Sequence, residues 1–387
     1  MPNASFSRHL KRKLELYYPD NTIEVINMGI SAINSFTLRD FANAILDKKP
    51  DLILIYTGHN EYYGALGVGS SVNLGYSRFL INTYLWLRDF RTTQFLQNII
   101  SGVYGLFSSA TSIDSDGANE TLMSRMIGES LIPLDSDLFN YGIDQFTGNM
   151  EDVIRILDEN EIPIIIGNLT CNLKDQKPFI SLNENKSINA DKVFLLAKEE
   201  YVNNNFLKAR QLFFKAKELD ALRFRAPGKI NEAIIKLASK YKLPLVNVDS
   251  VLQSNSPNGI VGANLMVDHL HPNIDGYRMM GDAYFNAMLR TKLLPKNIKA
   301  NIPIEIADSI LKANFPFTRL DSTLADLSVI VLTGSYPFVP KGTPNYKMMN
   351  LRPKDFVDTI AFKVMNKEIK WESSHATLSD YYFKKGD

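Results

Sequence analysis

The sequence predicts an α/β fold in which helices cover both faces of a parallel sheet. Short apolar runs recur between Glu24 and Asp249, and most of them end at a glycine. Longer amphipathic stretches, whose apolar residues repeat at helical spacing, lie between these runs. Strands that alternate with helices in this way form parallel sheets, and such strands are apolar throughout because both of their faces are buried.

The first predicted element is an amphipathic helix. Phe6, Leu10, Leu14 and Tyr17 repeat at helical spacing with basic residues between them, and Pro19 ends the pattern. The apolar runs that follow are predicted to be strands at Glu24–Met28, Asp51–Thr57, Ile162–Gly167 and Leu243–Asp249. The helices predicted between and after these strands are Thr37–Lys48, Met150–Glu159, Asn231–Tyr241 and Gly276–Leu289.

Composition narrows the class of protein. With 387 residues the chain exceeds the size of one ordinary core, so we expect one large domain with additions or two domains. Hydrophobic residues (45%) and charged residues (22%) stand in the proportion of a globular protein, which excludes a wholly disordered chain. The net charge of +1 argues against a nucleic-acid partner, and the single cysteine, Cys171, excludes an internal disulfide and a cysteine-based metal cluster. No apolar run reaches the roughly 18 residues that span a bilayer.

The predicted domain organisation follows from where the α/β pattern holds and where it stops. We expect residues 1–296 to form the α/β domain and residues 297–387 a helical C-terminal extension that leads into further repeats. Residues 65–148 follow a strand end and are rich in glycine, serine and aromatic residues, so they form either a lid or an ordinary insertion. Residues 189–222 have the spacing of a tetratricopeptide-like helical hairpin, which we expect to pack on the α/β domain because one unit does not make a solenoid.

The strongest candidate for chemistry is Asp268-His269-Leu270-His271-Pro272, which follows the fourth strand. Acyl transfer near neutral pH needs a base that accepts and returns a proton, and imidazole suits this role. A carboxylate orients such an imidazole, and Asp268 can reach His271 within one tight turn. The alternatives are a surface turn with two histidines, and a metal site formed by His269 and His271, for which no third ligand stands at a recognisable offset.

Two earlier turns offer hydrogen-bond donors for an oxyanion. Gly58-His59-Asn60-Glu61 closes the second strand, and the amide of Asn60 is a neutral N–H donor. Gly29 ends the first strand and can present a bare backbone N–H. Each signal is weak alone, since glycine and asparagine end strands in many proteins.

In this order and context, the three motifs resemble those of the SGNH (GDSL-type) hydrolase family, over residues 2–294. The resemblance implies a flavodoxin-like three-layer α/β/α sandwich, with helical insertions and a helical C-terminal extension as additions, and ester hydrolysis without a metal or an organic cofactor. It assigns Gly29 and Asn60 to the oxyanion hole, Asp268 to orienting the imidazole and His271 to the general base. Glu61 departs from the family's usual aspartate by one methylene group.

The nucleophile is the larger departure from the family. Its serine lies in a Gly-Asp-Ser-like block between the first strand and the first helix, whereas this sequence starts at that helix, and Ser5 and Ser7 stand too late. We expect Ser5 to be a helix cap. Thr333-Gly334-Ser335 is similar to this block, but it lies near the far end of the chain. To act as the nucleophile it would have to return to the centre of the sheet, whereas elements that follow each other in sequence are usually neighbours. We therefore expect the nucleophile to be missing from this chain and to lie upstream.

The sequence thus predicts a serine ester hydrolase of the O-acyl or O-acetyl esterase type, acting on an acylated small molecule or carbohydrate. An O-acyltransferase is an alternative, because a sugar hydroxyl can replace water at the same site. A second class is a non-catalytic scaffold whose helical repeats bind a protein partner. The resemblance also connects the chain with exported or envelope material, and an anchor could lie upstream. Arg223 and Arg225 either bind a substrate carboxylate or hold the hairpin on the sheet domain, and we favour the second role.

Overall fold

The computed structural model of the chain describes residues 4–71, 74–88, 90, 122–126, 131–182, 189–294 and 303–386. A three-stranded parallel sheet within them has the order β1 (Ile53–Ile55), β2 (Ile164–Gly167) and β3 (Leu245–Val246). The last three predicted strands are therefore confirmed, and each is shorter than its apolar run. β3 ends early because α10 (Val248–Ser254) begins where the run was expected to continue. Parallel strands in sequence order bring their carboxyl ends to one edge, where the turn after β1 and the loop after β2 begin.

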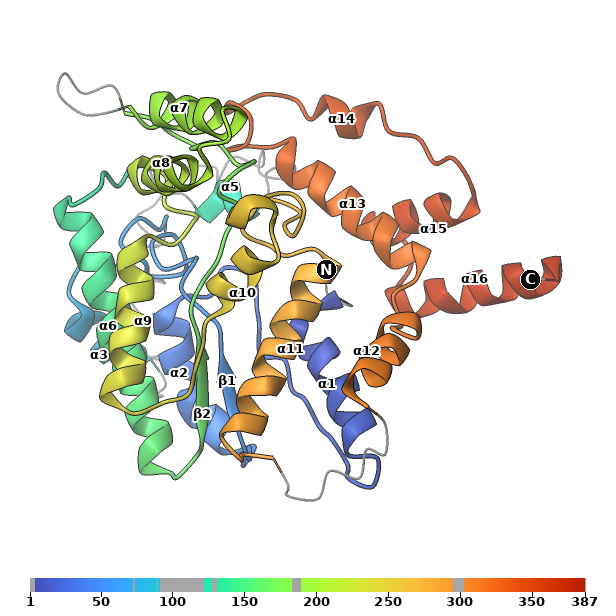
Figure 1. Cartoon of the computed structure of the whole chain (residues 1–387), viewed down its shortest axis with the longest axis horizontal. Helices are drawn as coiled ribbons and strands as arrows, with labels where there is room; N and C mark the ends of the chain where they lie inside the picture. The colour runs from blue at the N-terminus through green and yellow to red at the C-terminus, as the bar shows by residue number, and fades with distance from the viewer. Residues whose placement is uncertain are drawn as a thin grey trace, which may run out of the picture.

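Helices lie on both faces of this sheet (Figure 1). One face is covered by α2 (Ser35–Leu46), α6 (Asp137–Glu159) and α9 (Gly228–Lys240), and the other by α1 (Phe6–Tyr17) and α11 (Ile274–Arg290). The side chains of β2 alternate accordingly, because Ile165 packs with α1 and α11 whereas Ile164 and Ile166 pack with α6 and α9. The mixed α/β architecture with a parallel sheet is confirmed.

The first predicted strand, Glu24–Met28, is wrong. Residues 22–30 are not in a strand, and no backbone hydrogen bond joins them to the described strands. Ile26, Met28 and Ile30 are 55%, 44% and 57% exposed, whereas Ile23 and Val25 pack on the core beside α1. The segment has the alternation of a strand with one face on the core, but the described part of the chain has no strand beside it with which its backbone could pair.

The segment predicted as an insertion, residues 65–148, overlaps a helix of the α/β domain. Its described parts hold α3 (Arg78–Leu87), α5 (Leu122–Met126) and the first turns of α6, in which Phe139 and Phe146 are fully buried. Residues 72–73, 89, 91–121 and 127–130 lie outside the described residues. The predicted boundary at residue 148 falls inside α6, because some of the aromatic residues assigned to an insertion belong to a core helix.

The predicted helical hairpin at residues 189–222 contains α7 (Ala190–Val202) and α8 (Phe206–Leu219), which pack along each other. Ala197, Ala209 and Phe213 are buried in a cluster with Cys171 and Ile260, which belong to the α/β domain. A single helical pair cannot bury both of its apolar faces by itself, and this pair packs on the domain.

The described part of the C-terminal extension is helical. Its helices are α12 (Ile304–Ala313), α13 (Arg319–Thr333), α14 (Tyr346–Met349), α15 (Phe356–Met365) and α16 (Trp371–Lys385). None of the described helices combines the length and the apolar character needed to cross a bilayer.

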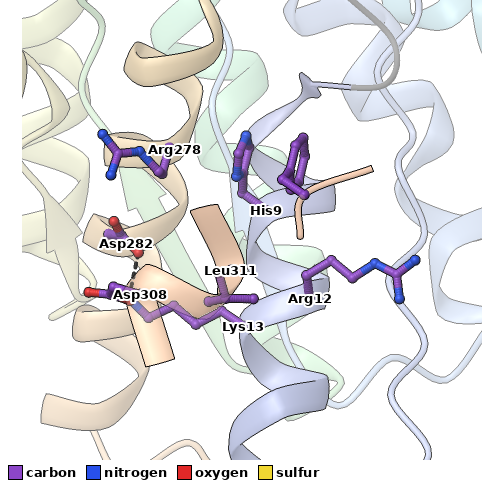
Figure 2. A pocket seen from close by; sticks show the side chains of 8 residues that line it. His9, Arg12, Lys13, Arg278, Asp282, Asp308 and Leu311 are labelled. Atoms are coloured by element: carbon purple, nitrogen blue, oxygen red, sulfur yellow. Dashed lines mark hydrogen bonds and ion pairs between the residues drawn. The ribbon is translucent and has the colours of Figure 1, made fainter. Parts of the chain in front are cut away.

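One contact between the extension and the α/β domain lies where α12 meets α1 (Figure 2). The ammonium group of Lys13, whose side chain is 5% exposed, lies 2.5 Å from Asp282 of α11 and 2.8 Å from Asp308 of α12. The ring of His9 stacks on Phe315 with 3.7 Å between the centroids. The hollow among these residues has a volume of about 20 Å³, enough for one water molecule and too small for a substrate. This junction is therefore a structural contact.

Candidate active site

The turn that carries the two candidate catalytic residues is closed at its base by backbone hydrogen bonds. Met266 and Pro272 form an antiparallel bridge, and the N–H of Val267 donates to the carbonyl of His271 at 2.9 Å. Asn273 then caps α11, since its side chain accepts from the N–H of Gly276 at 3.0 Å. A turn tied at its base and continued by a capped helix holds its side chains in one orientation.

Asp268 and His271 meet as their spacing predicts. His271 Nδ1 lies 2.7 Å from Asp268 Oδ2, and Asp268 Oδ1 accepts from the backbone N–H groups of Leu270 and His271 at 2.9 and 2.8 Å. Burial acts to raise the pKa of Asp268, but the imidazoles of His269 and His271 outweigh it and hold that pKa well below its usual value. An ionised carboxylate only accepts, so Nδ1 of His271 carries the proton and Nε2 is free to accept one.

The two members of this pair differ in their access to solvent. The side chain of Asp268 is 2% exposed, and that of His271 is 50% exposed. The carboxylate is therefore shielded from water, while the imidazole is accessible to a reactant. General base catalysis needs this combination of a fixed orienting carboxylate and an accessible base.

His269, the other histidine of the turn, points into the interior. Its ring packs edge-on against Phe179, Phe224 and Phe338, and its Nδ1 lies 3.4 Å from Asp268 Oδ1. Burial lowers the pKa of His269, so the ring is neutral near pH 7. In the described part of the chain, no group of three or more histidine, cysteine or carboxylate side chains is arranged to hold a metal ion.

Asn172, which the sequence analysis missed, fixes the turn from the loop after β2. Its Nδ2 donates to the carbonyl of Asp268 at 3.1 Å, and its backbone N–H donates to the carbonyl of His269 at 3.0 Å. Arg225 in turn donates to the carbonyl of Asn172 at 3.0 Å. Arg223 donates to the carbonyl of Ile132 at 2.9 Å, so both arginines have the structural role that we favoured. The only sequence signal for Asn172 is its place just beyond an apolar strand.

The Gly58–Glu61 turn after β1 is anchored by its carboxylate. Gly58 has a φ of 139°, a conformation that glycine adopts readily. Glu61 is fully buried and accepts from the N–H and hydroxyl of Ser35 at 3.0 and 2.7 Å and from Gln145 Nε2 at 2.5 Å. Burial raises the pKa of Glu61 to about 7. Both carboxylate oxygens of Glu61 are thus hydrogen-bonded, and these bonds connect the turn to α2 and α6.

Asn60, in the same turn, is half-buried, and no hydrogen bond from another described residue engages its side-chain amide. The neighbouring His59 is buried. Burial lowers the pKa of His59 to about 3, with contributions from the charges of His269 and His271. His59 Nδ1 accepts from the N–H of Ala226 at 3.2 Å, which links the turn to the loop that carries Arg225.

Gly29 does not present a bare N–H, and this expectation is corrected. Its N–H donates to Asn27 Oδ1 at 2.8 Å, within an exposed segment. Without a neighbouring strand to order residues 22–30, the nearest side-chain acceptor takes up the donor. Among the described residues, no hydrogen bond joins Gly29 or Asn60 to Asp268 or His271.

The described chain has no hydroxyl hydrogen-bonded to His271. Ser5 occupies the N-cap position of α1, but its hydroxyl lies 2.9 Å from that of Ser7 and makes no capping bond. The hydroxyls of Thr333 and Ser335 donate to the carbonyls of Val329 and Val331 in the last turns of α13. The Thr333-Gly334-Ser335 motif therefore belongs to a helix terminus.

A cavity of about 690 Å³ opens beside the Asp268–His271 pair. One wall comes from the turn itself, through Val267, Asp268 and His271. The other walls come from the C-terminal extension, through Phe317, Asp321, Leu324, Ala325, Ser328, Val329, Leu332, Val364, Trp371 and Glu372. This contribution of the extension had no signal in the sequence, because it depends on how distant helices pack.

No family model matches the chain, and no curated protein matches it in sequence. Solved structures that match include the crystal structure of an acetyl xylan esterase, AlAXEase, with 13% sequence identity and a TM-score of 0.37. The match covers 73% of this chain and 90% of that chain. Similarity at this level is too low to carry an argument about activity.

Proposed function

We propose that this chain carries the acid–base half of an ester hydrolase with an SGNH-like three-layer fold. The observation that supports it is the hydrogen bond between buried Asp268 and half-exposed His271 on the wall of a cavity of substrate size. An oriented imidazole with a free Nε2 is what acyl transfer requires of its base.

The proposed reaction has two halves. In the first, Nε2 of His271 accepts the proton of a serine hydroxyl while the serine oxygen bonds to the ester carbonyl carbon. The proton then passes to the alcohol oxygen as the carbon–oxygen bond breaks, which leaves an acyl-enzyme and a free alcohol. In the second half, His271 takes a proton from water in the same way, the carboxylic acid leaves, and the serine regains its proton.

The oxyanion formed in each half needs neutral donors. Asn60 is the proposed side-chain donor, since its amide is not engaged by other described residues. The N–H of Gly29 donates to Asn27 Oδ1, so Gly29 can serve as the second donor only after this hydrogen bond breaks. The proposal therefore includes a different conformation of residues 22–30 in the active enzyme. The nucleophilic serine is proposed to come from outside the described residues.

The test uses the protein encoded by the complete gene. It should hydrolyse p-nitrophenyl esters, and His271→Ala should lower kcat/KM by at least ~10³-fold with an unchanged circular dichroism spectrum. Arg155→Gln is the control, because Arg155 is 61% exposed on α6 and does not line the cavity. A fluorophosphonate probe should label one serine in the wild-type protein and fail to label His271→Ala, and mass spectrometry of the adduct identifies the nucleophile. Absence of hydrolysis and of labelling in the complete protein would overturn the proposal.

A scaffold function is a second candidate because the helical hairpin exposes apolar side chains. These are Leu195, Leu196, Val202, Leu207 and Phe214, with exposures between 44% and 78%. Exposed apolar residues grouped on one element are typical of a surface that binds another protein. A complete protein that is folded but inert toward esters and the fluorophosphonate probe would favour this reading.

Acyl transfer to a sugar hydroxyl remains a proposal for the same site. It predicts that an added alcohol diverts the acyl group from water, and the yield of the new ester measures this directly.

A further inference from the structure

The cavity beside His271 is large and mainly apolar in its lining. α13 contributes Leu324, Ala325, Val329 and Leu332, and Phe317 and Val364 add to the same wall. The volume of about 690 Å³ lies within the range of small-molecule sites, roughly 300–1,000 Å³. An acetyl group would leave most of this volume unfilled.

The charges of the lining restrict the ligand further. Its ionisable residues are Asp268, Asp321, Glu372 and His271, and none of the described residues that line it is a lysine or an arginine. Asp321 is buried and accepts from the indole N–H of Trp371 at 3.0 Å. Glu372 is exposed. An anionic group would meet three carboxylates and no lysine or arginine among these lining residues, so the lining suits a neutral apolar chain.

We infer that this cavity binds the acyl chain of a neutral ester of medium length, with the ester carbonyl at the Asp268–His271 end and the chain along α13. The inference rests on the proposed function for the reaction, but the binding of the chain can be measured without any reaction. It makes the C-terminal extension part of the substrate site, and it makes acetyl esters poor ligands.

The extension itself supplies a reporter. Trp371 lines the cavity, and the sequence has two tryptophans, of which the other, Trp86, is 63% exposed on α3. A Trp86→Phe protein therefore has fluorescence from Trp371 alone. The probe is 2-nonanone, an uncharged and non-hydrolysable analogue of a methyl octanoate, and acetone is the matching analogue of an acetate ester.

We expect 2-nonanone to change the Trp371 emission with a saturable curve and acetone to bind at least ~100-fold more weakly. Each buried methylene group strengthens binding about three- to fourfold, and the two ketones differ by six of them. Octanoate, the anionic analogue, should bind more weakly than 2-nonanone at pH 8, and Glu372→Gln should reduce this difference.

Two variants of α13 separate a filled cavity from a disturbed helix. Ser328 lines the cavity and Ser322 does not, and each hydroxyl donates only to a carbonyl of its own helix. Ser328→Phe should weaken 2-nonanone binding at least tenfold, whereas Ser322→Phe should leave it unchanged. If Ser328→Phe fails to fold, the octanoate comparison with Glu372→Gln still tests the site.

The outcomes distinguish this inference from the proposed function. Ketone binding that responds to Ser328→Phe supports the chain site even if no ester is hydrolysed. Equal binding of acetone and 2-nonanone, no saturable signal, or no effect of Ser328→Phe overturns the chain site even if the protein proves to be an esterase.

Discussion

At the scale of single residues, the Asp268–His271 contact has the most direct consequence. Asp268→Asn keeps the shape and the acceptor atom for the backbone N–H groups of Leu270 and His271. It removes the charge that holds the proton on Nδ1 of His271, so the imidazole is no longer fixed in the active tautomer. We expect ester hydrolysis by the complete protein to fall by about 10³–10⁴-fold, measured as kcat/KM. Asp275→Asn, an exposed acid in the first turn of α11, is the control. Full activity in Asp268→Asn would remove the pair from the mechanism.

His59 gives a second residue-scale prediction, on stability against pH. The pKa of the folded state is about 3, below the usual 6.5, so only the unfolded chain takes up a proton between these values. The stability that the neutral ring contributes is complete above pH 6.5 and declines as the pH falls toward 3, by about 1.4 kcal/mol per pH unit for one proton. His59→Gln should make the free energy of unfolding, measured with urea, depend less on pH between pH 6 and 4. The slope should fall by up to the amount that corresponds to about one proton. At pH 8 the same comparison measures the changes in packing and in the hydrogen bond from Ala226, without a proton. An unchanged slope would place His59 in a less buried setting.

The contrast between Asp268 and Asn172 shows what sequence reasoning can reach at this scale. Asp268 and His271 are three positions apart in one turn, so their contact follows from local geometry. Asn172 reaches Asp268 across 96 positions, and Ala226 reaches His59 across 167. Contacts of that length depend on the packing of the whole sheet, and periodicity and motif spacing carry no information about them.

At the scale of elements, residues 22–30 yield a third prediction. If this segment is exposed in solution as it is in the structure, Ile26→Lys should change the free energy of unfolding by less than about 0.5 kcal/mol. Ile165→Lys on β2, at a fully buried position, is the contrasting variant and should cost several kcal/mol or prevent folding. A large cost for Ile26→Lys in urea denaturation would mean that another strand covers the segment, which would also free Gly29 from Asn27.

The elements also show why helices were predicted better than strands. The α1 helix starts and ends where its apolar spacing predicts, at Phe6–Tyr17, because a helix satisfies its own backbone. A strand needs a neighbour, so the apolar run at Glu24–Met28 alone could not decide whether one forms. The start of α6 was missed for a different reason, since Gly142 and the aromatic residues near it resemble an insertion in composition.

At the scale of the whole molecule, the C-terminal extension links fold to function. The sequence predicted a helical extension but not that α13 would face the Asp268–His271 turn. That position depends on contacts between distant elements, namely α12 with α1, and Leu332 and Phe338 with the cluster around Phe224. The docking contact combines the Lys13 ammonium group with two carboxylates from different helices. We therefore expect an ion pair that lies outside the cavity to help hold the cavity wall in place.

Lys13→Ala tests this dependence. Burial acts to lower the pKa of Lys13, but its hydrogen bonds to Asp282 and Asp308 outweigh burial and raise it, so the pair is charged in the folded protein. Because both carboxylates are more than a third exposed, solvent screens part of the effect, and we expect a loss of about 1–2 kcal/mol in urea denaturation. Lys11→Ala, whose partner Glu15 is on the same exposed helix face, should cost less than about 0.5 kcal/mol.

Hydrogen exchange should quicken in α12 and α13 of Lys13→Ala and leave β2 unchanged. Binding of 2-nonanone should weaken in parallel, because a loosened α13 no longer closes the cavity. Faster exchange in α13 with full ketone affinity would contradict the coupling, since it would show that the cavity keeps its wall without the junction.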